Sequence, residues 1–414
     1  MNRISTNLPN DNTRFFMQRQ ETERSALQNQ ISSQERIQKL RDDPVGAGHA
    51  TRFESYSFRL DRYTDNIEYA QDNHRVTESH MQESVDIMQR IREIAIQGAN
   101  GTYSQEERRH MAAEVDELLE ELVDIGNSKN GTGNSIFAGA RSRSDAFQTL
   151  RGNVEGIEGN RITEVMYNGD ITRNMTEISD GASIEVNFPG NEFFWAENQQ
   201  VYSEVDATDY VVQEDSSFYI DGAEVNVKEG DSVFAVMDRI NNSDAAVSAR
   251  LDPVQEGLVL ESTTPHQLWL EDGEGSVLSD LGIVDGQAAG PPNNVSAGAQ
   301  VFGGSAFDMV INLRDRLLEN DQIDVGGVSL GGIDEALDNM LGKVARLGAQ
   351  DSRLEMTHDR VTRMNGNIDD QLSREVDVDM ASAITDMRMM EYTHQAAMGV
   401  AGRMLPQTLL DFLR

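Results

Sequence analysis

The sequence predicts an α+β protein in which a long helical rod carries an inserted, mostly β domain. Two stretches near the ends of the 414-residue chain repeat apolar residues every three or four positions, and the stretch between them alternates apolar with polar residues. The first pattern is typical of a narrow contact stripe on an α-helix and the second of a β-strand. Because a helix with so thin a stripe is unstable alone in water, we expect the two to pack together as an antiparallel coiled-coil bundle.

The chain is strongly acidic, with 35 basic and 71 acidic residues and a formal net charge of −36. Such a charge repels phosphate backbones and anionic lipids, so we expect neither nucleic acid nor a membrane as a partner. Cysteine is absent, which excludes disulfides, thiolate zinc sites and cysteine nucleophiles. Residues 151–325 hold 8 basic and 33 acidic groups, whereas both ends are nearly neutral. This contrast indicates that the ends pack against other chains and the middle faces solvent.

The first long helix is expected to begin at Asp43-Pro44, because aspartate caps helices and proline suits the first helical position. Its stripe continues to Ala95, and the segment Gly98–Thr102 ends it. The seam residues that we predict to face the rod interior are Phe53, Leu60, Ile67, Met81 and Met88.

A second helix is predicted to follow from Ser104, with Glu107 completing a capping box three residues later. It should end at Gly126, and Asn130–Gly133 is predicted to form a turn.

The matching helix near the other end keeps the same spacing from Leu337 to Leu372. Three polar residues on its seam, Asp351, His358 and Asn365, lie seven positions apart, and His74 interrupts the first seam. Polar groups on a seam weaken the packing but fix its register. An antiparallel alignment of the two seams places His74 near Asp351. The predicted apolar seam here comprises Leu337, Val344, Leu347, Leu354, Val361, Ile368 and Leu372.

The centre of the chain predicts short strands and tight turns. A strand ending at Tyr167 is followed by Asn168-Gly169, and a second pair of strands flanks Asp221-Gly222; both dipeptides favour hairpin turns. A short helix is expected over residues 232–241. Further strands are expected over residues 184–188, 258–260 and 268–270.

We therefore divide the chain into five parts: terminal arms 1–45 and 376–414, rod halves 46–150 (with a β-hairpin) and 326–375, and an inserted outer domain 151–325. The last turns, Leu409–Leu413, are too apolar to remain exposed, and we expect both arms to become ordered helices only when subunits assemble. The predicted arm contacts are Ile4, Leu8, Leu405, Leu409, Phe412 and Leu413.

No constellation of catalytic residues is apparent. The seven histidines form no HExxH pair or other close metal-ligand spacing, and no nucleophile has a nearby base. We therefore expect no enzyme activity, no cofactor and no metal. The first residues also lack the apolar core of a secretion signal, so export is expected to use another route.

Several short segments, in order along the chain, resemble the flagellin-like proteins of the bacterial flagellum. Within that family the resemblance is greatest to the hook-associated protein 3 group, which joins hook to filament. The sequence Gly402–Gln407 departs from the Asn-Gln pattern near the end of filament flagellins, which favours a junction protein. The segments that carry the resemblance are Asn2–Asn7, Asp42–Pro44, Ala99–Thr102, Ile136–Gly139, Tyr167–Asp170, Ile220–Gly222, Ile240-Asn241, Leu281–Ile283, Leu347–Ala349 and Leu409–Leu413.

The resemblance implies a structural protein that is exported unfolded by the flagellar type III apparatus. It implies a ring of copies placed on hook-associated protein 1, a template for flagellin, and an export chaperone that holds the carboxyl-terminal arm. The location would be the flagellum, either external or enclosed in the periplasm. The alternatives are a filament subunit, a coiled-coil scaffold or adhesin, and an enzyme domain carried in the centre.

Overall fold

The computed structural model describes residues 8–39, 41–286 and 290–404. The chain forms two compact units. Unit 1 comprises the described residues as far as Asp65 together with those from His358 onwards, and unit 2 comprises Asn66–Thr357. The long helices α2 (Pro44–Gly98) and α9 (Leu330–Val376) contribute to both units, so each unit contains segments from both halves of the chain.

The helices α2 and α9 lie side by side and antiparallel, as predicted. In unit 1, the Asn365 amide donates to Asp61 over 2.7 Å. In unit 2, Arg92 lies 2.5 Å from Asp334 in an ion pair between the same two helices. The helix α2 begins where expected, because Asp43 Oδ1 accepts a hydrogen bond of 2.9 Å from the Gly46 N–H.

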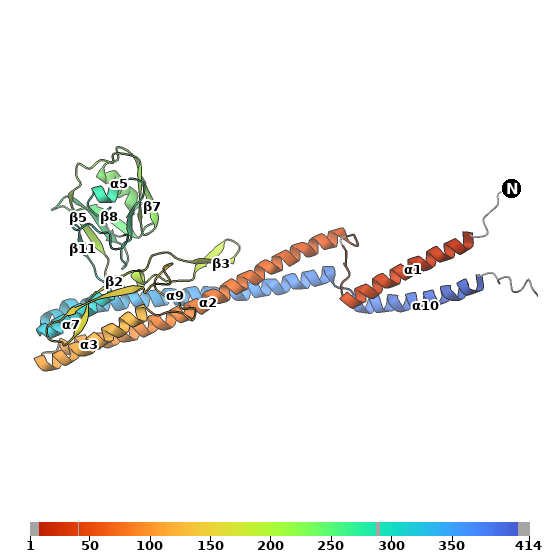
Figure 1. Ribbon diagram of the computed structural model, residues 1–414, viewed down its shortest axis with the longest axis horizontal. Coiled ribbons are helices and arrows are strands. Elements are labelled where there is room, and N and C mark those ends of the chain that lie inside the picture. Colours follow the sequence, from red (N-terminus) through yellow and green to blue (C-terminus); the bar gives the residue numbers. More distant parts are fainter. Residues whose placement is uncertain (1–7, 40, 287–289, 405–414) are drawn as a thin grey trace, which may run out of the picture. The chain divides into compact units, whose positions relative to one another are not determined.

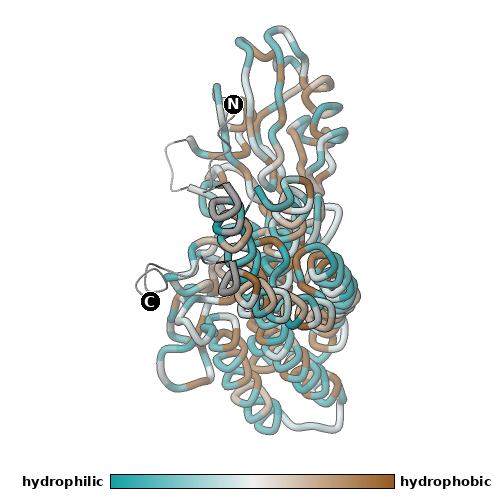
Figure 2. The backbone as a smooth tube through the Cα atoms, turned by 90° about the vertical axis from the view of Figure 1, so that its right-hand side faces the viewer, coloured by the Kyte–Doolittle hydropathy of each residue, from teal (hydrophilic) through white to brown (hydrophobic). Residues whose placement is uncertain are grey.

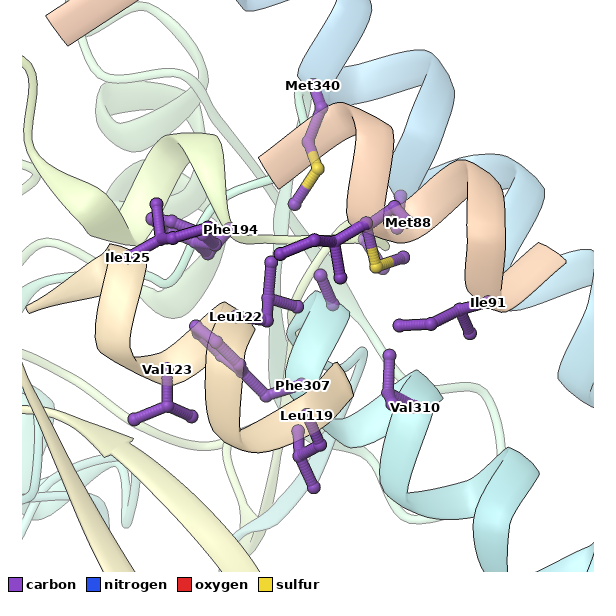
Figure 3. Close-up of a cluster of buried hydrophobic side chains, with 14 of the residues drawn as sticks. Met88, Ile91, Leu119, Leu122, Val123, Ile125, Phe194, Phe307, Val310 and Met340 are labelled. Carbon is purple, nitrogen blue, oxygen red and sulfur yellow. The ribbon is translucent and has the colours of Figure 1, made fainter. Parts of the chain in front are cut away.

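The helical part of unit 2 surrounds one apolar core. Helix α3 (Gln105–Gly126) begins with the predicted Ser104–Glu107 capping box, and α7 (Ala306–Glu319) begins with an equivalent box. The short helix α8 (Gln322–Asp324) and a π-helical turn (Val325–Ser329) lead into α9. Figure 3 shows how side chains from different helices meet in this core: Met88 and Ile91 of α2, Leu119 and Leu122 of α3, Phe307 and Val310 of α7, and Met340 of α9.

Two hairpins and a helical turn pack beside these helices: β1 (Phe147–Asn153) with β2 (Asn160–Tyr167), β3 (Met175–Ser179) with β4 (Ala182–Glu185), and α4 (Gly190–Phe193). The hairpin turn predicted at Asn168-Gly169 is wrong, because β2 pairs backwards with β1. Gly169 instead lies against the Tyr167 ring, and an added Cβ would come within 2.4 Å of its hydroxyl. The glycine of this Asn-Gly pair is therefore explained by its close packing against Tyr167, not by a hairpin turn.

The remaining strands form a lobe, residues 197–302, with a hydrophobic core of its own. Its two antiparallel sheets have the strand orders β11-β5-β9-β8 and β10-β6-β7. Figure 2 shows apolar and polar residues interspersed along the backbone of the lobe, at the top of the view. The elements of the lobe are β5 (Gln200–Asp206), β6 (Ser216–Ile220), β7 (Ala223–Val227), α5 (Val233–Asn241), β8 (Val247–Leu251), β9 (Gly257–Ser262), β10 (Leu270–Asp272), α6 (Val277–Asp280) and β11 (Gln300–Phe302).

Predictions within the lobe largely hold. The turn between β6 and β7 is formed by Asp221 and Gly222, with φ of 51° and 80°. Asp221 also holds the segment that leads into β10. Its carboxylate accepts a hydrogen bond from the Trp269 N–H over 3.0 Å and lies 2.9 Å from the His266 ring. The helix expected over 232–241 and the strand over 258–260 are present, whereas the strand expected at 268–270 begins only at Leu270.

The part with its own β-rich core is shorter in the structure than the predicted range of residues 151–325. The boundary after residue 150 falls inside β1, and the boundary after residue 325 falls inside the π-helical turn. The rings of Phe147 of β1 and Phe307 of α7 pack at a tilt inside the helical core, with their centroids 4.9 Å apart. This aromatic packing makes the β1–β2 hairpin and α7 part of the helical core of unit 2. Among the described residues, only the lobe, residues 197–302, has a separate hydrophobic core.

Candidate assembly site

The terminal helices of unit 1 expose large apolar side chains. Helix α1 (Leu8–Ser33) contacts α10 (Met380–Met404), but two helices cannot cover all of each other's apolar residues. Phe15, Phe16 and Tyr392 are 62%, 61% and 73% exposed, and Met389 and Met398 are also exposed. Exposed apolar side chains of this size make α1 and α10 a candidate surface for contact with another protein.

The segment between α1 and α2 is hydrogen-bonded to the segment between α9 and α10. The Arg36 N–H donates to the Val376 carbonyl over 2.6 Å, and the Val378 N–H donates to the Gln34 carbonyl over 2.9 Å. The Arg36 guanidinium reaches the Glu375 carbonyl and, at 3.1 Å, the Asp43 carboxylate. The hydrogen bond from the Gly46 N–H, followed by the one from Arg36, lowers the pKa of Asp43. These contacts hold the base of both arms in one place.

The predicted seam residues are all buried or half-buried. Four of them, Phe53, Val344, Ile368 and Leu372, retain partial exposure. The fully buried ones are Leu60, Ile67, Met81, Met88, Leu337, Leu347, Leu354 and Val361.

The polar residues on the seams behave differently from one another. Asn365 links the two helices through Asp61 and Ser57, and His358 and Asp351 are half-buried on α9. The prediction placed His74 near Asp351, but the hydrogen bond of the His74 ring is made with β4. The His74 Nε2 atom lies 2.8 Å from the Glu185 carbonyl, and its Nδ1 atom is buried without a hydrogen-bond partner among the described residues. The loop after β4 fills the space beside His74 with the Phe188 ring.

Of the predicted arm contacts, Ile4, Leu405, Leu409, Phe412 and Leu413 lie outside the described residues. For Leu8 the structure describes only its position at the start of α1.

Two ionic clusters of unit 2, one buried and one half-buried, were not predicted. In the first, Arg314 of α7 lies 2.9 Å from Asp116 of α3, and Arg161 of β2 lies 3.0 Å from the other carboxylate oxygen. Arg314 also donates to the Ile162 carbonyl over 2.6 Å. The partners lie 198 residues apart, so no local sequence pattern could have revealed them.

The second cluster attaches α4 to α9. The Glu192 carboxylate accepts from Lys343 over 2.7 Å and also from Arg173, which in turn pairs with Glu185. Burial by itself would raise the pKa of Glu192, but attraction to Lys343 and then to Arg173 outweighs burial and lowers it to about 2. The Glu192 carboxyl therefore stays ionised down to about pH 2, and its ion pairs hold the two elements together.

Neither cluster resembles a metal centre. Within residues 8–39, 41–286 and 290–404, the structure brings together no group of three or more histidine and carboxylate side chains that could hold an ion. In the same part of the chain, no helix has the length and apolar content needed to cross a membrane.

Comparisons with known proteins identify relatives along the whole chain. The chain is 23% identical to polar flagellin C of Vibrio parahaemolyticus over 99% of both proteins. It is 25% identical to flagellar hook-associated protein 3 of Escherichia coli over 38% of this chain and 54% of that protein. The chain also spans less than half the length of the treponemal flagellar filament proteins that it matches.

Among solved structures, the hook-associated protein 3 of Legionella pneumophila is similar, with 19% identity and a TM-score of 0.47 over 78% of this chain and 98% of that one.

Family models give the broadest assignment. The bacterial flagellin N-terminal helical region matches residues 4–142, and the flagellin C-terminal helical region matches residues 330–413. Together the two regions cover more than half of the chain, and they coincide with the paired helices described above. The chain therefore belongs to the flagellin family of structural proteins of the bacterial flagellum.

Proposed function

We propose that this flagellar protein forms the junction between hook and filament, where a ring of copies assembles through the terminal helices of unit 1. The observation that carries the proposal is the exposed apolar surface of α1 and α10. The similarity to hook-associated protein 3 of Escherichia coli supports the position at the junction.

The charge of the chain supports assembly through unit 1. Residues 1–65 and 358–414 have 16 basic and 18 acidic residues, a net charge of −2, whereas residues 66–357 have a net charge of −34. Copies can approach closely through a nearly neutral surface without strong repulsion. Neighbouring copies would then cover Phe15, Phe16 and Tyr392, at about 25 cal/mol for each Å² of apolar surface removed from water. This gain offsets the entropy lost when side chains of the arms are held against neighbouring copies.

In this proposal the neighbours of the ring are hook-associated protein 1 on one side and flagellin on the other. Before assembly the protein is exported to the flagellum, and a chaperone covers the carboxyl-terminal arm inside the cell. These partners complete a structural role that requires no catalysis by the chain itself.

A second candidate is the filament subunit itself. The observation that favours it is the end-to-end alignment with polar flagellin C, which covers 99% of both chains.

Immunogold labelling of isolated flagella distinguishes the two candidates. A junction protein is expected in one narrow band between hook and filament, and a strain that lacks it should shed unpolymerised flagellin into the medium. Labelling along the whole filament, together with long filaments formed by the purified protein alone, would overturn the junction proposal in favour of the filament subunit.

A further inference from the structure

The lobe, residues 197–302, carries an extreme charge for its size. Its sequence contains 20 acidic residues and only 3 basic ones, Lys228, Arg239 and Arg250, so its net charge is −17. Arg239 pairs with Asp231 at 2.8 Å, and Arg250 lies 3.7 Å from Glu261. Three cations cannot neutralise this number of carboxylates, so most of the negative charge of the lobe must be balanced by ions from solution.

The fold places several of these carboxylates near one another. In the sheet β10-β6-β7, Glu271 and Glu224 are the cross-strand neighbours of the same residue, Tyr219, so the two glutamates flank it on one face. Both are exposed. Like charges two strands apart on one face repel each other at low salt, and this repulsion destabilises the sheet because it is weaker in the unfolded chain.

A cleft of about 1010 Å³ adds a second concentration of charge. The lobe contributes Glu197, Asp252 and Glu261 to its lining, and α9 contributes Glu335 and Asp338. Clefts lined by one sign of charge focus the electric field between their walls. Carboxylates of the lobe therefore repel those of the helix that the lobe faces.

We propose that dissolved cations control the folding of the lobe: it is folded in a salty medium and opens in a dilute one, while the helical core of unit 2 stays folded. Screening is the physical cause. The distance over which charges interact falls from about 10 Å at 0.1 M salt to about 3 Å at 1 M. The separate hydrophobic core of the lobe allows it to open alone, because local units of a protein can unfold below the global free energy.

Hydrogen exchange followed by mass spectrometry on the full chain tests this proposal, because it reports each segment separately. Between ~0.05 M and ~1 M NaCl, amide protection in β6, β7, β8 and β9 is expected to rise by about tenfold or more. Protection in α3 and α7 should stay nearly constant. Equal salt responses in the lobe and in α3 would overturn the proposal.

A charge-neutralised variant provides the matched comparison. Glu204→Gln, Glu224→Gln and Glu271→Gln remove three exposed carboxylates from strands of the lobe. This triple variant should keep its protection at lower salt than the natural chain. The control variant, Glu54→Gln, Glu355→Gln and Glu391→Gln, removes three exposed carboxylates from helices outside the lobe and should leave the salt response of the lobe unchanged. Identical behaviour of both variants would contradict the proposal.

A comparison of anions separates screening from a general strengthening of apolar burial. At equal ionic strength, sodium chloride and sodium sulfate should protect the lobe to the same degree if screening is the cause. Much greater protection by sulfate would overturn the proposal, since sulfate strengthens the burial of apolar surface.

Discussion

The guanidinium of Arg314 and the carboxylate of Asp116 lie 2.9 Å apart, and their side chains are only 1% and 2% exposed. Because α7 and α3 contribute one charge each, the pair joins helices from opposite halves of the chain. Each charge is buried at a large cost in hydration, which is offset by its partner and by the further contacts of Asp116 with Arg161 and of Arg314 with the Ile162 carbonyl.

Arg314→Met should therefore destabilise the protein by about 3–5 kcal/mol, because Asp116 is left buried without this partner. Urea unfolding monitored by circular dichroism measures the loss. The control is Arg316→Met on the same helix, which breaks a more exposed pair with Glu319 and should cost about 1 kcal/mol or less. Equal losses for the two variants would show that the Arg314 pair is not effectively buried.

The seam of α9 gives a second prediction. Leu347→Ala and Leu354→Ala should each destabilise the protein by about 2–5 kcal/mol, since both side chains are fully buried. Leu341, which is 47% exposed on the same helix, is the control, and its change to alanine should have a much smaller effect. Thermal and urea unfolding of the three variants measure these losses. Equal losses of stability for all three would contradict the burial of Leu347 and Leu354 in the seam.

The Glu192 cluster predicts a dependence of stability on pH. The folded chain lowers the pKa of this carboxyl from 4.5 to about 2, so the folded state binds its proton less readily than the unfolded state. The contribution to stability is therefore complete above about pH 4.5 and is lost as the pH falls towards 2. It amounts to on the order of 3 kcal/mol.

The control for that contribution is Glu192→Gln, whose side chain does not titrate. The difference in unfolding free energy between the natural chain and this variant should shrink steadily on acidification from pH 5. A difference that stays constant down to pH 3 would mean that Glu192 is not held ionised by Lys343 and Arg173.

The exposed surface of the arms predicts a separation of folding from assembly. Phe15→Gln with Phe16→Gln should leave the urea unfolding midpoint of the purified protein nearly unchanged, because both rings are already in water. The same variant should fail to restore flagella in a strain that lacks the natural gene. Val254→Gln, at a lobe residue that is 85% exposed, is the control and should restore them. Full restoration by the double variant would exclude these rings from the assembly surface.

Local sequence patterns predicted the helices well because their causes are local. Asp43 and Ser104 begin helices as expected, since a capping side chain acts on backbone groups within three residues. Three contacts between α2 and α9 correspond to a register in which His74 is level with Asp351: His49–Glu375, Asp61–Asn365 and Arg92–Asp334. The spacing of the seams therefore predicted the alignment correctly.

Contacts between distant segments could not be predicted in the same way. His74 binds the Glu185 carbonyl because the loop after β4 covers this stretch of α2, and nothing in the helix sequence reveals that loop. Lys343 and Glu192 are 151 residues apart, and each looks like an ordinary surface charge within its own segment. The apolar arms were predicted from composition alone, but the Arg36 contacts that tie them together depend on the folded backbone.

The lobe enters and leaves the helical part at adjacent points of the backbone. The Ala196 N–H donates to the Gly304 carbonyl over 3.0 Å, and the Ala306 N–H donates to the Phe194 carbonyl over 2.7 Å. A domain attached in this way is an exchangeable module: a short loop could replace it, or a foreign sequence could occupy its place, without rerouting the chain on either side. Variation in the lobe can thus proceed independently of the helical part that carries it.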